Sequence, residues 1–91
     1  TLYGAEAKYL VALQWYNAGN YASAEKEILN FIDQSTPYAY WLARSFILLS
    51  DVYVAMDKKL DARQYLLSLQ QNYQADDDIA SMINERLEKL K

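Results

Sequence analysis

The sequence predicts an all-α fold in which five helices form antiparallel hairpins within a single domain over residues 1–91. Two glycines and one proline in 91 residues are too few for a turn-rich β fold. Apolar residues recur at three- and four-residue spacing along most of the chain, as they do on one face of a helix. In addition, residues 3–34 and 37–74 share one pattern of small, aromatic and aliphatic positions.

The first hairpin is predicted to pair a helix at 3–17 with a helix at 21–33. Gly19 separates them, since glycine adopts the left-handed conformation that commonly ends a helix. The apolar positions are Ala7, Val11, Ala12, Trp15 and Ala18 in the first helix, and Ala24, Ile28, Phe31 and Ile32 in the second.

The second hairpin is predicted to pair helices at 37–56 and 60–73. Ser35 or Thr36 is a suitable N-cap for the first of them, and Pro37 suits a first turn because its missing N–H has no helical partner there. This helix is the longest and most apolar, so we expect it to be the most buried. Its apolar positions are Trp41, Leu42, Phe46, Leu49 and Tyr53, and those of its partner are Ala62, Tyr65, Leu66 and Leu69.

A last helix is predicted at 77–90, after a run of three aspartates. Asp76 or Asp77 is expected to cap it, because a negative charge is favourable at the positive end of the helix dipole. One apolar stripe contains Ile79, Met82, Ile83, Leu87 and Leu90, and the solvent side is expected to hold Glu85, Arg86, Glu88 and Lys89.

The two hairpins repeat each other with a spacing of 38 residues. Small residues allow two antiparallel helices to approach closely, and the aromatic residues fill the space beside them. The equivalent pairs are Ala12 and Ser50, Trp15 and Tyr53, Ala24 and Ala62, and Ile28 and Leu66.

These positions make residues 5–74 resemble the tetratricopeptide repeat family. The residues that match are Val11, Ala12, Trp15, Gly19, Tyr21, Ala24 and Ile28, then Phe46, Leu49, Ser50, Tyr53, Ala62 and Leu66. The resemblance implies a fragment of a right-handed α-solenoid whose concave groove binds a protein or peptide. It is nearest to the divergent repeats of bacterial envelope proteins, which implies a periplasmic or outer-membrane-associated location, with the cytoplasm as the alternative. The abrupt ends of the pattern indicate a domain cut from a longer chain.

Five features depart from the family pattern. Lys8 stands where the first large apolar residue belongs, and Asp57 replaces the glycine of the second turn. Phe31 and Leu69 are bulky where alanine is usual, and the terminal proline of the first repeat is displaced to Pro37. The spacing of 38 residues also exceeds the usual 34.

Composition excludes several classes of site. The chain has no cysteine and no histidine, which excludes disulfides, Cys/His zinc sites and histidine-based triads. A net charge of −3 argues against a nucleic-acid partner. The aspartate run at 76–78 lacks the glycine and ligand spacing of a calcium loop, and two glycines cannot form a phosphate-binding loop. We therefore expect no enzymatic activity, metal or cofactor, and a longest apolar run of six residues predicts no membrane-spanning segment.

The candidate binding site is the groove that the resemblance places on the first helix of each hairpin. Tyr9, Leu13 and Tyr16 form a second apolar stripe that contact within the hairpin does not require, whereas Trp15, Phe46 and Tyr53 fall on core positions. Either a ligand or a neighbouring repeat could cover this stripe. The candidate groove residues are Glu6, Tyr9, Leu13, Tyr16, Asn17, Arg44 and Asp51, flanked by Ile47, Leu48, Val54 and Ala55.

Three functions fit these observations. The first is a scaffold module that binds a protein or peptide, with pairing of two copies through an uncapped face as a variant. The second is a purely structural brace in a larger envelope protein. The third is glycan binding, because Tyr38, Tyr40 and Trp41 gather at the start of one helix and aromatic rings can stack on sugars.

Overall fold

The computed structural model describes residues 2–33 and 37–91, with side chains described from Gly4 onward in the first helix. Five helices and no strand occur in this part of the chain, which confirms the predicted all-α class. None of the described helices is long and apolar enough to cross a membrane. The helices are α1 (Leu2–Asn17), α2 (Tyr21–Asp33), α3 (Ala39–Ala55), α4 (Lys59–Asn72) and α5 (Ile79–Lys89).

Two helices begin two residues later than the sequence predicted. Tyr38 occupies the N-cap position of α3, so Pro37 lies outside that helix. The expected capping by Ser35 or Thr36 falls outside the described residues. Asp78 occupies the N-cap position of α5, but the carboxylate of Asp77 accepts a hydrogen bond from the Ile79 N–H at 2.9 Å. The predicted N-cap, Asp76 or Asp77, is therefore wrong by at least one residue, although the Asp77 side chain does bond to the first N–H of the helix.

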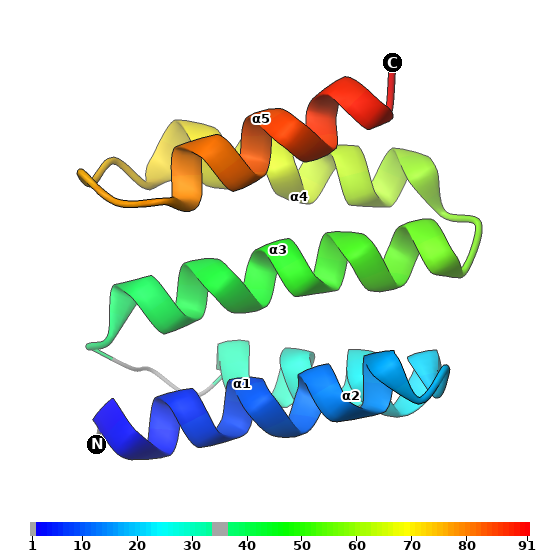
Figure 1. Ribbon diagram of the computed structural model, residues 1–91, viewed down its shortest axis with the longest axis vertical. Helices are drawn as coiled ribbons and strands as arrows, with labels where there is room; N and C mark the ends of the chain where they lie inside the picture. The colour runs from blue at the N-terminus through cyan, green and yellow to red at the C-terminus, as the bar shows by residue number, and fades with distance from the viewer. Residues whose placement is uncertain (1, 34–36) are drawn as a thin grey trace.

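The helices are arranged around α3. Figure 1 shows α1 in front of α2 and α5 in front of α4, with α3 between the two pairs. α3 contacts all four other helices, and it is the longest with eight buried residues, as predicted from its composition. α1 and α5 both pack on α3 but make no contact with each other, so an opening remains between them over α3.

Small residues are buried at equivalent places in the two hairpins. Ala24 on α2 and Ala62 on α4 are both 0% exposed, and Ala12 and Ser50 are buried on the facing helices. The Ser50 hydroxyl donates a 2.7 Å hydrogen bond to the Ile47 carbonyl, so its burial leaves no donor unsatisfied. These four positions agree with the sequence prediction.

The two hairpin turns have the same backbone geometry. Gly19 and Asp57, which are 38 residues apart, both have positive φ, +79° and +62°. Gly19 N–H donates to the Tyr16 carbonyl at 3.0 Å, and Asp57 N–H donates to the Val54 carbonyl at 3.1 Å. The next residue in each turn donates to the carbonyl five residues back. Because aspartate tolerates the left-handed region better than most residues, Asp57 can replace the expected glycine.

The predicted burial of Trp15 and Val11 is wrong: they are 39% and 42% exposed, whereas their equivalents Tyr53 and Leu49 are 8% and 0% exposed. The cause is the neighbouring helix. α2 packs beside α3 and covers Leu49 and Tyr53, but no described helix covers the corresponding side of α1.

The aromatic residues of the second hairpin lie closer to their predicted places. Burial first, and then the Glu25 carboxylate of α2, raise the pKa of Tyr53. Phe46, predicted as a core residue, is half-buried, with its ring 5.9 Å from that of Tyr65. The second hairpin therefore has the predicted interior at Leu49, Tyr53, Ala62 and Leu66, whereas Phe46 and Tyr65 are only half-buried. The first hairpin has it only on the side facing α2 and α3.

Candidate functional site

A cleft of about 620 Å³ lies between α1 and α5, with α3 along its base. It exists because those two helices pack on α3 without meeting each other. Its lining comes from α1 (Tyr9, Leu13, Tyr16), α3 (Arg44, Ile47, Leu48, Ser50, Asp51, Val54), α4 (Lys59, Leu66), α5 (Met82, Glu85, Arg86, Lys89) and the residue after it, Leu90.

Five of the seven candidate residues line this cleft, namely Tyr9, Leu13, Tyr16, Arg44 and Asp51. The other two, Glu6 and Asn17, do not line it. The cleft follows α1 only from Tyr9 to Tyr16. Glu6 comes before this stretch of the helix and Asn17 comes after it.

Tyr9 differs from its predicted exposed position on the groove stripe. It is only 6% exposed and belongs to the main hydrophobic core. Its ring lies 5.5 Å from the Trp41 ring, and the Arg44 guanidinium carbon is 5.0 Å from the ring centre. The Tyr9 hydroxyl accepts a 3.1 Å hydrogen bond from Arg44 Nη2. Tyr9 therefore forms part of the floor of the cleft and not an open contact surface.

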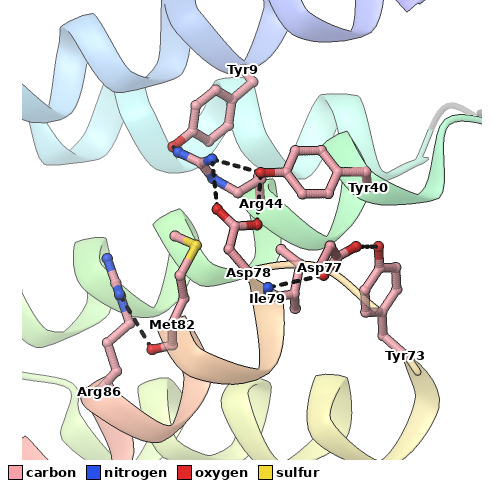
Figure 2. Close-up of polar contacts among 9 residues, drawn as sticks. All are labelled: Tyr9, Tyr40, Arg44, Tyr73, Asp77, Asp78, Ile79, Met82 and Arg86. Atoms are coloured by element: carbon pink, nitrogen blue, oxygen red, sulfur yellow. Dashed lines mark hydrogen bonds and ion pairs between the residues drawn. The ribbon is translucent and has the colours of Figure 1, made fainter. Parts of the chain in front are cut away.

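Arg44 joins three helices at one end of the cleft (Figure 2). Besides its bond to Tyr9, its Nη1 donates to the Tyr40 hydroxyl at 2.9 Å, and that hydroxyl donates to Asp78 Oδ1 at 2.9 Å. Burial alone lowers the pKa of Arg44, but the hydrogen bonds to Tyr40 and Tyr9 outweigh it and raise the pKa overall. The network fixes the start of α5 against α1 and α3.

The same network occupies the aromatic cluster that suggested glycan binding. The Arg44 guanidinium lies 5.9 Å from the Tyr40 ring centre and 6.0 Å from that of Trp41. The Tyr40 and Trp41 rings are 5.2 Å apart in an edge-to-face arrangement, and Trp41 also packs on the core. Tyr40 and Trp41 are therefore already in contact with Arg44 and with each other, and glycan binding stays a prediction.

Asp51 and Arg86 form a two-bond ion pair across the cleft. Arg86 Nε donates to Asp51 Oδ1 at 2.9 Å, and Nη2 donates to Oδ2 at 3.1 Å. Both side chains are about one quarter exposed, 23% for Asp51 and 25% for Arg86. Paired charge-assisted bonds of this geometry are among the stronger polar contacts in proteins. The pair ties α5 to the C-terminal half of α3.

Arg86 was predicted on the solvent side of the last helix, but it is half-buried and paired with Asp51, so this prediction is wrong. Arg86 follows Ile79 by seven residues and Ile83 by three, so it lies on the same helical face as these two buried residues. The sequence therefore contained a signal for the position of Arg86, namely its spacing of seven and three residues from these two isoleucines. The contribution of α4 and α5 to the cleft was also missed: Lys59, Leu66, Met82, Glu85, Arg86, Lys89 and Leu90 were not among the candidates.

Tyr16 lies at the edge of the cleft and is half-buried, with its ring 5.7 Å from the Tyr21 ring. Burial first, and then the nearby Asp51 carboxylate, raise the pKa of Tyr16. Its hydroxyl is therefore protonated at neutral pH and can donate a hydrogen bond. In the same cleft, Val54 is 39% exposed, and Leu13 and Leu90 are half-buried, so the lining combines apolar and polar groups.

Comparisons with protein-family models, with curated proteins and with solved structures find no match to this chain. Fold and site together define a class: an all-helical domain of two antiparallel hairpins and a terminal helix, with a mixed apolar and charged cleft.

Proposed function

We propose that this chain is a non-catalytic interaction module that binds a peptide or protein segment in the cleft between α1 and α5. The observation that carries the proposal is the lining of that cleft. It combines exposed apolar surface at Val54, half-buried Leu13 and Leu90, and hydrogen-bonding groups such as the Tyr16 hydroxyl. Such a mixture suits a peptide, whose side chains need apolar contact and whose backbone needs polar partners.

The same proposal treats the hairpins as two tetratricopeptide-like repeats, at 3–34 and 37–74, with 77–90 as a terminal helix in a right-handed solenoid. Support comes from the matching turns at Gly19 and Asp57 and from the buried small residues at equivalent places. In such an arrangement the cleft corresponds to the concave face, where the first helix of each repeat is exposed to a ligand.

A structural brace is the second candidate, and the exposed side of α1 favours it. Val11 and Trp15 lie four residues apart there, and their equivalents in the second hairpin are covered by a helix. A brace would bury this side of α1 against another helix, whereas a cleft binder would use the opposite side. The two roles therefore predict different interaction surfaces.

The test is selection of peptides from a phage-displayed library of 12-residue sequences on the immobilised chain. Val54→Trp places a large side chain in the cleft. We expect it to lower the affinity for the selected peptides about tenfold or more, which is a loss of about 1.4 kcal/mol of binding free energy. Leu67→Trp is the matched control, because Leu67 is 42% exposed and does not line the cleft. Failure to select any peptide, or equal binding to both variants, would refute cleft binding.

A further inference from the structure

The distribution of charge in the cleft identifies the kind of peptide that it fits, an inference that rests on the proposed function. The cleft lining holds four of the nine basic residues of the chain and two of the twelve acidic ones. Its formal charge is therefore +2, while the rest of the chain carries −5. We propose that the occupant is an acidic peptide segment with aliphatic side chains, and that Lys59 pairs with one of its carboxylates.

Ion pairing within the protein leaves the positive charge available. Both cleft acids are already paired, Asp51 with Arg86 at 2.9 Å and Glu85 with Lys89 at 3.7 Å. Lys59 forms no ion pair with any described residue, and it is exposed. Arg44 is also paired, with Asp78 at 3.9 Å. The charged group of the cleft that remains to interact with an occupant is therefore the ammonium group of Lys59.

The positive charge of Lys59 does not stabilise α4, the helix on which it lies. Lys59 is the first residue of α4, where a positive charge opposes the helix dipole. It also lies four residues before Arg63, and like charges at this spacing repel each other along a helix. Cations in the last turn of α5, Arg86 and Lys89, stabilise their own helix end, so Lys59 is the one that points most clearly to an external partner.

The apolar residues that line the cleft with Lys59 indicate that the peptide also needs an aliphatic side chain. α3 ends and α4 begins at this end of the cleft, so Lys59 follows closely after Val54, which is 39% exposed. Half-buried Leu13 and Leu90 line the same cleft. An acidic residue next to an aliphatic one would therefore satisfy both the ammonium group and the apolar surface.

The first experiment is to sequence the 12-residue peptides that the wild-type chain selects and to compare their composition with the unselected library. We expect enrichment in Asp or Glu together with Leu, Ile, Val or Met. The affinity of the best synthetic peptide should also fall as salt is raised, because exposed ion pairs are screened. Neutral or basic peptides that still depend on Val54 would overturn this inference and leave the proposed function intact; no selection at all would overturn both.

The second experiment measures the best acidic peptide by fluorescence anisotropy against Lys59→Glu and Lys26→Glu. Both substitutions change the net charge equally, but Lys26 is exposed on α2 and does not line the cleft. We expect Lys59→Glu to weaken binding about three- to tenfold and Lys26→Glu to leave it unchanged within about twofold.

A melting curve separates binding from folding in this comparison. Glu at position 59 is favourable at a helix start and opposite Arg63, so Lys59→Glu should not lower the melting temperature. Weaker binding with unchanged melting supports the inference. Equal affinity of both variants, or a loss of binding that follows a loss of folding, would overturn it.

Discussion

Tyr9→Ala is expected to lower the free energy of unfolding by about 3–5 kcal/mol, the range for removing a large buried aromatic side chain. Tyr9 is 6% exposed and touches both the core and Trp41. The substitution also removes the hydroxyl that accepts a hydrogen bond from Arg44, whose Nε is already buried without a partner. Urea denaturation followed by circular dichroism at 222 nm measures the effect.

Tyr9→Phe is the control for this prediction, because it keeps the ring and removes only the hydroxyl. We expect a loss of about 1 kcal/mol, the usual net value of one hydrogen bond. If Tyr9→Ala is as stable as the wild type and loses peptide binding instead, Tyr9 is an exposed contact residue and its position in the core is wrong.

Ala24→Leu and Ala62→Leu are each expected to cost about 1–3 kcal/mol of stability through overpacking. Both alanines are 0% exposed within their hairpins, so three added carbon atoms must push the surrounding side chains or helices apart. Similar losses in the two variants follow from their equivalent positions. The same urea denaturation measures both.

Ala22→Leu serves as the matched variant, since Ala22 is exposed on the same helix as Ala24. It should change the free energy of unfolding by no more than about 0.5 kcal/mol. Should the wild-type stability survive both buried substitutions, the small residues would not set the hairpin spacing, and the repeat interpretation would lose its main support.

The regular part of the fold could be predicted because its signals are local. Apolar spacing locates the five helices, although α3 and α5 start two residues later than predicted. The equivalence of Ala24 and Ala62 is visible in the sequence alone. Burial depends on neighbours instead. Trp15 and Tyr53 occupy equivalent positions, but only Tyr53 has a helix beside it, and no feature of either hairpin by itself reveals that difference.

The cleft could be predicted only in part for the same reason. Tyr9, Leu13, Tyr16, Arg44 and Asp51 were found because they lie on one face of two helices that share a pattern. The third wall comes from α5, which falls outside that pattern, so its residues were missed. The pairing of Arg86 with Asp51 joins residues 35 positions apart and requires knowledge of how α5 packs on α3.

The position of the bound peptide tests the central claim, the cleft as a binding site, most directly. Methyl-labelled leucine and valine residues report on it by NMR when the selected acidic peptide is added. We predict that the largest shift changes occur at Leu13, Val54 and Leu90, which line the cleft. The control methyl groups are those of Leu29, Leu60 and Leu67, which are exposed and do not line the cleft. Largest changes at these three residues, or at Val11 on the uncovered side of α1, would contradict the account.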